Sequence, residues 1–421
     1  MSALLHVLIR GTPAGELTLT RGRLLFRYAP GWLQSHIALP LSLSMPLALP
    51  EYGHAEVSPF LWNLLPDNEQ VIQSWARRYQ VSTGTPFGLL AHVGEDCAGA
   101  VQFVLPGRLD EVRQGEVIPL SEADIAERLR ELRRNPAEAR RSNDLGQFSL
   151  SGAQAKTALR KTGQGWALPT GAEPTTHIFK PPRPELDGHV ENEHFCLRLA
   201  AAAGLRCASS RVLHFSDEMA IVVQRYDRLE RNGRWERLHQ EDMCQALGVH
   251  PAHKYEAEGG PGIVDIMQLL QGSRDPQADR TRFLEAIVFN YLIGGTDAHA
   301  KNYSLLLSPT GFRLAPLYDI ASVLPYVDRR RDMRLAMRIG QHYRPEYIMP
   351  RHWEALARQC RYPAERLMGQ LRSLLARLPD LAADTAARIR ADGVEHDVLD
   401  QLCQGIAERC QRLMQRFGAE V

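Results

Sequence analysis

A chain of 421 residues is longer than most single domains, so we expect at least two domains. Hydrophobic residues make up 44% of the chain and charged residues 24%, which is typical of a soluble globular protein. The formal net charge of +1 argues against a protein whose whole surface attracts nucleic acid or anionic membrane.

The cysteine content and the lengths of the apolar runs indicate the cellular compartment of the protein. Seven cysteines without a CxxC pair or metal-type clustering predict free thiols in a reducing cytosol. The first six residues are too mixed for a signal peptide, and no apolar run reaches the roughly 18 residues that span a bilayer. We therefore expect a cytoplasmic protein with no membrane partner.

Residues 1–106 predict a small N-terminal α/β domain. Turn residues separate short apolar runs, which predict strands at residues 4–10, 15–19, 24–28, 36–41 and 98–105. Pro66 and Asp67 favour the start of a helix that continues to about residue 79, and a shorter helix is expected at residues 85–91. No cluster of catalytic residue types occurs here, so we expect a structural or docking role.

Residues 107–146 predict a helical linker. Ser121 and Asp124 form a capping-box pattern, and Ile125, Leu129 and Leu132 follow at helical spacing. A charged, irregular stretch at residues 135–144 then marks the domain boundary.

A turn of small residues follows between two expected strands. Backbone N–H groups in such a turn can approach an anion closely, and Lys156 can add a point charge. The candidate phosphate-binding residues are Ser151, Gly152, Ala153, Gln154 and Lys156. Taken alone, the pattern is better explained by an ordinary β-turn, and only the later Asp297 motif favours a phosphate-covering loop.

Lysine is rare in this chain, and its positions are informative. Only five of the fifty basic residues are lysines, and three of the five lie in the motifs described here: Lys156, Lys180 and Lys301. Lys180 ends an expected strand about 25 residues after the turn, where kinases place the lysine that pairs with the α/β-phosphates. Glu193, near the start of the next helix, is its expected ion-pair partner.

The strand that ends at Gln224 is interpreted as leading into a kinase hinge. Gln224 would contact the adenine edge and Tyr226 would pack on the base, whereas a simple strand end is the alternative. Residues 147–228 would then form the small lobe. From residue 229 to residue 421 the pattern is mainly helical, with a short helix expected at 239–248 and four or so helices from residue 350.

The strongest pattern lies between an apolar helix and an expected hairpin. Asp297 follows the helix, Asn302 comes five residues later, and Asp319 follows the hairpin. Protein kinases use this order for a base and two oxygen ligands of Mg²⁺. We therefore predict Asp297 as the base and Asn302 and Asp319 as metal ligands that also hold the nucleotide. His299 and Lys301 would contact the γ-phosphate or brace the loop.

Together these motifs resemble the HipA family of serine/threonine kinases, the toxins of type II toxin–antitoxin pairs. The matching segments are residues 44–47, 64–68, 149–157, Lys180, 224–228, 239–242, 296–302 and 318–320. The resemblance spans almost the whole chain and implies an α+β, two-lobed protein-kinase-like fold. Gln224, where an acidic residue is common, and Ala155 depart from the family pattern.

The resemblance also implies cofactors and partners. These are ATP and Mg²⁺, a protein substrate of the aminoacyl-tRNA synthetase class such as glutamyl-tRNA synthetase, and a HipB-like helix-turn-helix antitoxin that binds operator DNA. It further implies autophosphorylation of the turn at Ser149 or Ser151, which inactivates the kinase. A lipid or small-molecule kinase, or a non-catalytic DNA-binding corepressor, is the alternative. The intact Asp297, Asn302, Asp319 and Lys180 argue against the corepressor.

Overall fold

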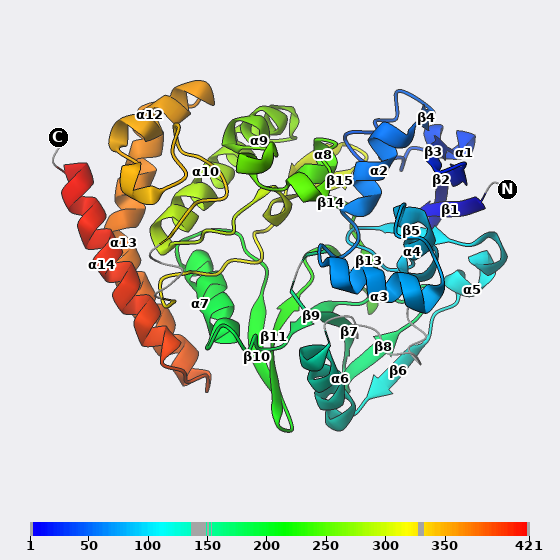
Figure 1. Ribbon diagram of the computed structural model, residues 1–421, viewed down its shortest axis with the longest axis horizontal. Coiled ribbons are helices and arrows are strands. Elements are labelled where there is room, and N and C mark those ends of the chain that lie inside the picture. Colours follow the sequence, from blue (N-terminus) through cyan, green and yellow to red (C-terminus); the bar gives the residue numbers. More distant parts are fainter. Residues whose placement is uncertain (1–2, 136–148, 150, 153, 327–331, 419–421) are drawn as a thin grey trace. The chain divides into compact units, whose positions relative to one another are not determined.

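The computed structural model describes residues 3–135, 149, 151–152, 154–326 and 332–418 (Figure 1). The chain divides into two compact units. The first unit contains residues Met1–Pro181, Leu213–Ala252 and Leu305–Phe312, and the second contains Pro182–Val212, His253–Ser304 and Arg313–Val421. Both helices and strands are present, as the expected α+β class requires.

The first unit begins with a five-stranded antiparallel sheet in the order β4-β3-β2-β1-β5. Its strands are β1 (Ala3–Ile9), β2 (Thr12–Thr20), β3 (Arg23–Tyr28), β4 (Glu51–Tyr52) and β5 (Val101–Val104). The accompanying helices are α1 (Pro30–Leu33), α2 (His54–Trp62), α3 (Glu69–Tyr79) and α4 (Pro86–Val93). The Asn68 side chain caps α3 by accepting the N–H groups of Gln70 and Val71, which explains where this helix starts.

The strand expected at residues 36–41 is wrong, because this segment belongs to no strand. Its backbone bonds to side chains instead. The Trp32 indole donates to the Leu39 carbonyl at 3.1 Å, and the Leu41 N–H donates to the Tyr28 hydroxyl at 2.7 Å. A buried segment needs partners for its backbone polar groups, and here two aromatic side chains supply them.

A second sheet of the first unit has the order β10-β11-β9-β7-β8-β6. Its strands are β6 (Val117–Leu120), β7 (Thr157–Thr162), β8 (Gly165–Pro169), β9 (His177–Lys180), β10 (Ser210–Phe215) and β11 (Glu218–Gln224). Helix α5 (Leu109–Arg113) precedes this sheet, and α6 (Glu122–Arg134) begins at the expected capping box of Ser121 and Asp124. Ile125 and Leu129 of α6 pack with Leu159, Phe179 and Val222, as the helical spacing predicts.

The helix expected at residues 239–248 is only partly correct. The segment starts as β14 (Gln240–Asp242) and becomes helical at α8 (Met243–Ala246), which Asp242 caps. β14 pairs in a small sheet with β15 (Ser304–Ser308), which pairs with β16 (Gly311–Leu314). Strand pairing therefore overrides the local helical pattern. A further hairpin, β12 (Arg228–Arg231) with β13 (Arg234–Arg237), precedes it.

Buried His239 lies directly before β14 and suits a test of pH dependence. Its Nδ1 accepts the Ala100 N–H at 3.3 Å, and its Nε2 bonds the Leu41 carbonyl at 2.9 Å. Burial lowers the pKa of His239 to about 4. Below pH ~6.5 His239 is therefore protonated in the unfolded chain but stays neutral in the folded chain. The free energy of unfolding decreases as the pH is lowered from about 6.5 to about 4.

His239→Gln removes this titration and keeps one donor and one acceptor. Between pH 7.5 and pH 5 we expect wild type to lose about 2 kcal/mol more stability than the variant. Thermal unfolding midpoints of both proteins at the two pH values measure this difference. Equal pH shifts of the two midpoints would contradict the assignment.

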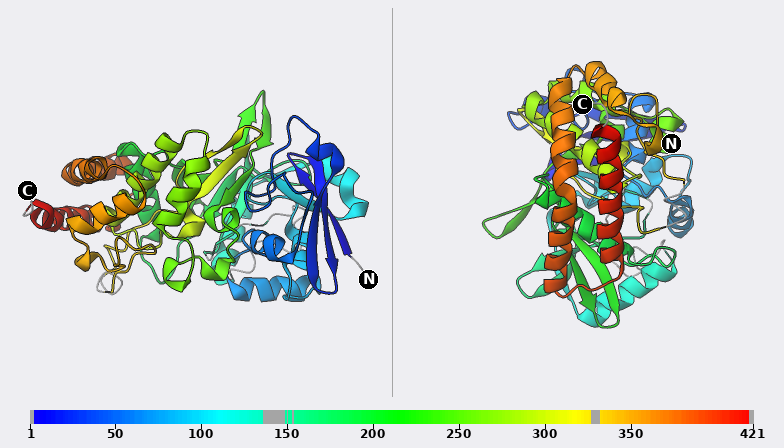
Figure 2. Two further views of the ribbon diagram at one scale, coloured as in Figure 1. Left: turned by 90° about the horizontal axis from the view of Figure 1, so that it is seen from above. Right: turned by 90° about the vertical axis from the view of Figure 1, so that its left-hand side faces the viewer.

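The second unit is mainly helical. Its helices are α7 (His189–Ala202), α9 (Ile263–Leu269), α10 (Pro276–Ile293), α12 (Pro350–Gln359), α13 (Ala364–Ala391) and α14 (Val398–Gly418). Three helices, rather than the expected four or so, follow residue 350, and α13 and α14 lie side by side (Figure 2). From Phe283 to Ile293 every residue of α10 except Glu285 is buried, so this helix is central to the unit. Within the described ranges, no helix combines the length and apolar character needed to cross a membrane.

Candidate active site

The loop that carries Asp297 begins where α10 ends. Gly294 adopts a left-handed conformation (φ 71°) and stops the helix. The next residue, Gly295, donates its N–H to the Asn290 carbonyl at 2.8 Å. A Cβ atom on Gly295 would lie 2.3 Å from the Asn290 side-chain oxygen, so a larger residue would have to displace the Asn290 side chain. The tight turn delivers Asp297 directly after the buried helix.

The backbone of Asp297 is fixed by hydrogen bonds within the loop. Its carbonyl accepts the His299 N–H at 2.8 Å and the Asn302 side-chain Nδ2 at 2.7 Å. Residues Ala300–Asn302 form one 3₁₀ turn before β15. The five-residue spacing therefore has a direct structural reason, because the Asn302 side chain closes the loop onto Asp297.

The Asp297 carboxylate is 73% exposed and has one close side-chain partner. The Tyr255 hydroxyl donates to its Oδ1 at 2.6 Å, and the His299 Nε2 lies 4.0 Å from the same oxygen. The Tyr255 and His299 rings also meet edge to face, with centroids 5.0 Å apart. One carboxylate oxygen is thus oriented, while the exposed side chain leaves Oδ2 for another donor. Sequence reasoning missed Tyr255, which lies 42 residues upstream without a motif spacing.

Tyr255→Phe tests whether this hydroxyl orients the carboxylate. The phenyl ring retains the contact with His299, but the hydrogen bond to Asp297 is lost. We expect the phosphoryl-transfer rate to fall about tenfold, while the KM for ATP stays unchanged. Initial rates of autophosphorylation at a series of ATP concentrations measure both values. Tyr347→Phe, at a 56% exposed tyrosine, is the matched control, and an equal loss there would contradict the assignment.

Asp319 is attached to the same loop through its neighbour Tyr318. The Tyr318 hydroxyl donates to the Lys301 carbonyl at 2.6 Å and lies 2.6 Å from the Ser304 Oγ. The Asp319 side chain is exposed, and its backbone has a φ of 56°, an uncommon value outside glycine. His299 and Lys301 are both buried, with exposed fractions of 5%. The second unit therefore brings together Asp297, Asn302 and the segment that carries Asp319.

This segment offers oxygen atoms of the kind that bind a hard divalent cation. The Asn302 Nδ2 is used by the loop, so its Oδ1 remains as an acceptor, and Asp319 contributes a carboxylate. Nowhere in the described residues do three or more His, Cys, Asp or Glu side chains form a metal-binding group. Mg²⁺ usually takes one or two protein oxygens and completes its shell with phosphates and water. The residues present fit that ion.

In the first unit, Ser149 is completely buried and doubly hydrogen-bonded. Its hydroxyl donates to the Leu64 carbonyl at 2.7 Å, and its N–H donates to the Asp96 carbonyl at 3.1 Å. Both acceptors belong to the N-terminal segment of the chain. The start of the small-residue turn is therefore docked on residues that are more than 50 positions away.

The turn that follows is closed by a lysine. The Lys156 ammonium donates to the Ser151 carbonyl at 2.6 Å, and the Gly152 carbonyl accepts the Asp67 N–H at 3.2 Å. Gly152 has a φ of 102°, which favours glycine. Gln154 is half-buried, and Ala153 lies outside the described residues. Ser151, Gly152 and Lys156 are therefore close together, as the sequence pattern predicts.

Lys180, Gln224 and Tyr226 also belong to the first unit, whereas Asp297, Asn302 and Asp319 belong to the second. Lys180 ends β9, where it is buried and pairs with Ile221 of β11. Gln224 ends β11 with an exposed side chain, and the Tyr226 hydroxyl bonds the Gln240 side chain. The expected ion pair between Lys180 and Glu193 stays a prediction.

The residues beside this strand end form a buried charge cluster that the sequence reasoning did not anticipate. Asp96 accepts bonds from Arg228 and Arg237, each at 2.8 Å, and from the Thr175 hydroxyl at 2.6 Å. Arg225 pairs with Asp227 at 2.9 Å. Burial alone would raise the pKa of Asp96, but the three guanidinium groups outweigh it and hold this pKa well below its usual range.

Residues 225–227 connect the end of β11 to β12. Gln224 is exposed and Tyr226 is half-buried, whereas Arg225 and Asp227 are each 4% exposed. Asp96 also accepts the Ser149 N–H through its backbone carbonyl. The cluster therefore links the strand end to the docking point of the small-residue turn, within one unit.

Comparison with known proteins gives consistent matches over the whole chain. The model of a family described as the HipA-like C-terminal domain matches residues 148–382, and that of the HipA N-terminal domain matches residues 5–104. The Sinorhizobium fredii protein Y4mE is 37% identical over 396 residues, which cover 92% of each chain. The serine/threonine-protein kinase toxin HipA of Shewanella oneidensis is 30% identical over 419 residues, covering 95% of this chain and 93% of that protein.

A solved structure agrees with these sequence matches. It contains the Shewanella oneidensis toxin–antitoxin proteins HipA and HipB with their operator DNA. The similarity has a TM-score of 0.83 at 28% identity and covers 97% of each chain. The expected two-lobed α+β fold is thereby confirmed.

Proposed function

Because the chain belongs to the HipA family of serine/threonine-protein kinases, we propose that it transfers the γ-phosphate of ATP to a serine of a translation enzyme. The observation that carries this proposal is the Asp297 loop. Its backbone is closed by Asn302, its carboxylate is oriented by Tyr255, and Tyr318 ties the Asp319 segment to it. These are the parts that phosphoryl transfer needs, because this reaction depends on positioning and charge stabilisation.

Asp297 is proposed as the base that receives the proton of the acceptor serine. Its Oδ1 is held by Tyr255, so Oδ2 would accept the hydroxyl hydrogen. Mg²⁺, held by the Asn302 Oδ1 and the Asp319 carboxylate, would neutralise charge on the phosphates. Lys301 and His299 are buried in the loop, which favours a bracing role over direct contact with the γ-phosphate.

The nucleotide is proposed to bind to residues of the first unit as well. Lys180 and the turn formed by Ser151, Gly152, Gln154 and Lys156 would hold the phosphates. Their backbone N–H groups and two ammonium groups supply the positive charge that a triphosphate requires. Tyr226 would pack on the adenine and Gln224 would contact its edge.

Ser149 is proposed as the residue that the kinase phosphorylates on itself. Its buried hydroxyl donates to the Leu64 carbonyl, and a phosphate with a charge of roughly −2 has no proton with which to keep this bond. A modified Ser149 would therefore have to leave this position and take the phosphate-binding turn with it. Autophosphorylation would then switch off nucleotide binding. Ser151 is the alternative modified residue.

The proposed partners follow from the family. The solved Shewanella relative is assembled with HipB and operator DNA, so we propose a HipB-like antitoxin for this chain. The proposed substrate is an aminoacyl-tRNA synthetase such as glutamyl-tRNA synthetase, and its modification would stall translation in the cytoplasm. Functionally, we divide the chain into an N-terminal domain (1–106), a linker (107–146), a small lobe (147–228) and a helical lobe (229–421).

A phosphoproteome of expressing cells tests the proposal. We expect wild type, but not Asp297→Ala, to add phosphate to a serine of an aminoacyl-tRNA synthetase and to arrest growth. Asp319→Ala should behave like Asp297→Ala. Transfer of labelled phosphate to a lipid or small molecule, with no new phosphoprotein, would contradict a protein substrate.

A further inference from the structure

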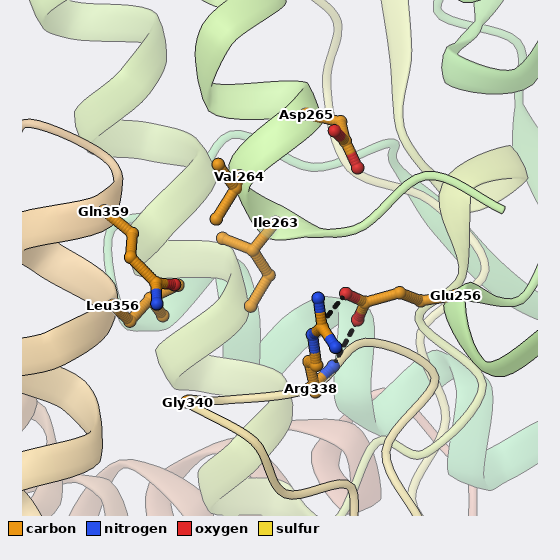
Figure 3. Close-up of a pocket in the computed structure, with 8 residues that line it drawn as sticks. All are labelled: Glu256, Ile263, Val264, Asp265, Arg338, Gly340, Leu356 and Gln359. Carbon is orange, nitrogen blue, oxygen red and sulfur yellow. Dashed lines mark hydrogen bonds and ion pairs between the residues drawn. The ribbon is translucent and has the colours of Figure 1, made fainter. Parts of the chain in front are cut away.

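A cavity of about 280 Å³ in the second unit is not explained by the proposed chemistry (Figure 3). Drug-sized ligands usually occupy roughly 300–1,000 Å³, so the cavity suits one side chain better than a whole metabolite. Apolar residues line one part of the cavity, and charged residues line another part. Ile263, Val264 and Leu356 form the apolar part, and Glu256, Asp265 and Arg338 form the charged part.

In the charged part of the cavity, acidic side chains outnumber basic ones. The Arg338 Nε lies 2.9 Å from the Glu256 Oε1, so this cation is already paired, and the Arg338 backbone N–H donates to Oε2 at 2.6 Å. Asp265 adds a second carboxylate, and only its Oδ2 is used, by the Gly262 N–H at 2.9 Å. Burial raises the pKa of Glu256 in spite of Arg338, and the charge of Asp265 adds to the rise. The cavity is thus lined by two carboxylates and one guanidinium, and the guanidinium is paired with Glu256.

The apolar part opens to the outside at Val264, whereas Ile263 and Leu356 are each only 2% exposed. Val264 is 36% exposed, and Gln359 lies at the rim with an exposed side chain. An occupant that satisfies both parts has an aliphatic stem and a cationic head. Lysine and arginine have this construction, because their methylene groups can lie along apolar surface while the charge reaches a carboxylate.

The cavity lies on segments that neighbour the Asp297 loop in the second unit. Glu256 directly follows Tyr255, whose hydroxyl bonds the Asp297 carboxylate. Ile263 also lines a smaller cavity together with Gly295 and Ala298 of the catalytic loop. The cavity is therefore linked to the Asp297 loop through Tyr255 on one side and Ile263 on the other.

We propose that the cavity binds a lysine or arginine of the substrate protein that flanks the acceptor serine, an inference that rests on the proposed kinase function. The stem packs on Val264, and the cationic head pairs with Asp265 beside Glu256. The cavity thus selects basic sequences around the acceptor serine.

Two variants remove the selectivity in different ways. Asp265→Asn keeps the acceptor for the Gly262 N–H and removes the negative charge. Gln359→Lys places a competing cation at the rim from an exposed position, where folding is not at risk. Gln404→Lys adds the same charge on α14, at an exposed residue outside the cavity, and is the matched control.

Binding of fluorescent pentapeptides, measured by anisotropy, tests the proposal. Each peptide carries a central serine and one arginine at a single flanking position, with norleucine replacing that arginine in its partner. For at least one position we expect wild type and Gln404→Lys to bind the arginine peptide about tenfold more tightly. The ratio should fall below about threefold in Asp265→Asn and Gln359→Lys.

The outcomes for the cavity and for the kinase are separable. No arginine preference at any position, or an equal preference in all four proteins, would overturn the cavity proposal. Autophosphorylation with Mg²⁺-ATP is measured on the same preparations. Selective peptide binding without any phosphoryl transfer would support the cavity proposal and contradict the proposed kinase function. Phosphoryl transfer without selective peptide binding would support the kinase function and contradict the cavity proposal.

Discussion

Asp297→Asn is expected to lower the rate of autophosphorylation by about a thousandfold, the loss typical when a general base is removed. Asparagine retains the shape of the side chain and can still accept the Tyr255 hydroxyl, but it cannot take a proton from serine. The loop bonds to Asn302 and His299 use the backbone carbonyl of residue 297, so the substitution leaves them intact. A loss of phosphoryl transfer would therefore be due to the missing base and not to misfolding of the loop.

The measurement is incorporation of labelled phosphate from Mg²⁺-ATP, together with nucleotide affinity by calorimetry. We expect the affinity to change by less than about threefold, since Asp297 is assigned neither to the phosphates nor to the metal. Asp380→Asn, at an exposed aspartate of α13, controls for the loss of one charge. If Asp297→Asn retains wild-type labelling, Asp297 is not the base.

Short-range patterns predicted the local structure well. The capping box at Ser121 and the glycine that stops α10 act within a few residues, so the sequence carries their full signal. The segment at 36–41 has an equally good strand pattern, yet side chains of Trp32 and Tyr28 satisfy its backbone. Such partners are set by tertiary packing, which a local pattern does not contain.

The candidate site shows the same difference between contacts that are short-range and contacts that are long-range in the sequence. The spacing of Asp297 and Asn302 is visible in the sequence because one side chain closes one short loop. Tyr255 and the Asp96 cluster reach their partners across 42 to 141 residues, where no fixed spacing exists. The rarity of lysine pointed to Lys156 and Lys180, but the arginines at 225, 228 and 237 were hidden among many others.

Ser149→Asp is expected to weaken ATP binding by about a hundredfold. The serine is fully buried, and its hydroxyl and N–H both bond to backbone carbonyls, those of Leu64 and Asp96. A carboxylate at this position cannot donate to the Leu64 carbonyl as the hydroxyl does, and burying a charge against a carbonyl oxygen costs several kcal/mol. The lowest-energy response is for the segment to leave its docking place, which would remove the turn that holds the phosphates.

Three further variants separate the role of the charge from the loss of a hydroxyl. Ser149→Ala removes one hydrogen bond, at a cost of about 1 kcal/mol, and should keep ATP affinity within about threefold. It should also abolish most autophosphorylation. Ser151→Ala should retain the label, and Ser151→Asp places the same charge at a half-buried position two residues away.

Calorimetric titration with a non-hydrolysable ATP analogue and mass spectrometry of the labelled protein measure both effects. If Ser149→Asp binds the analogue like wild type, docking of this segment does not control the nucleotide site. If the label persists in Ser149→Ala and disappears in Ser151→Ala, the modified residue is Ser151. The argument for Ser149 rests on its burial: a hydroxyl that must leave the interior to be phosphorylated cannot return once it carries the phosphate. The modification would therefore hold the turn away from the nucleotide until the phosphate is removed.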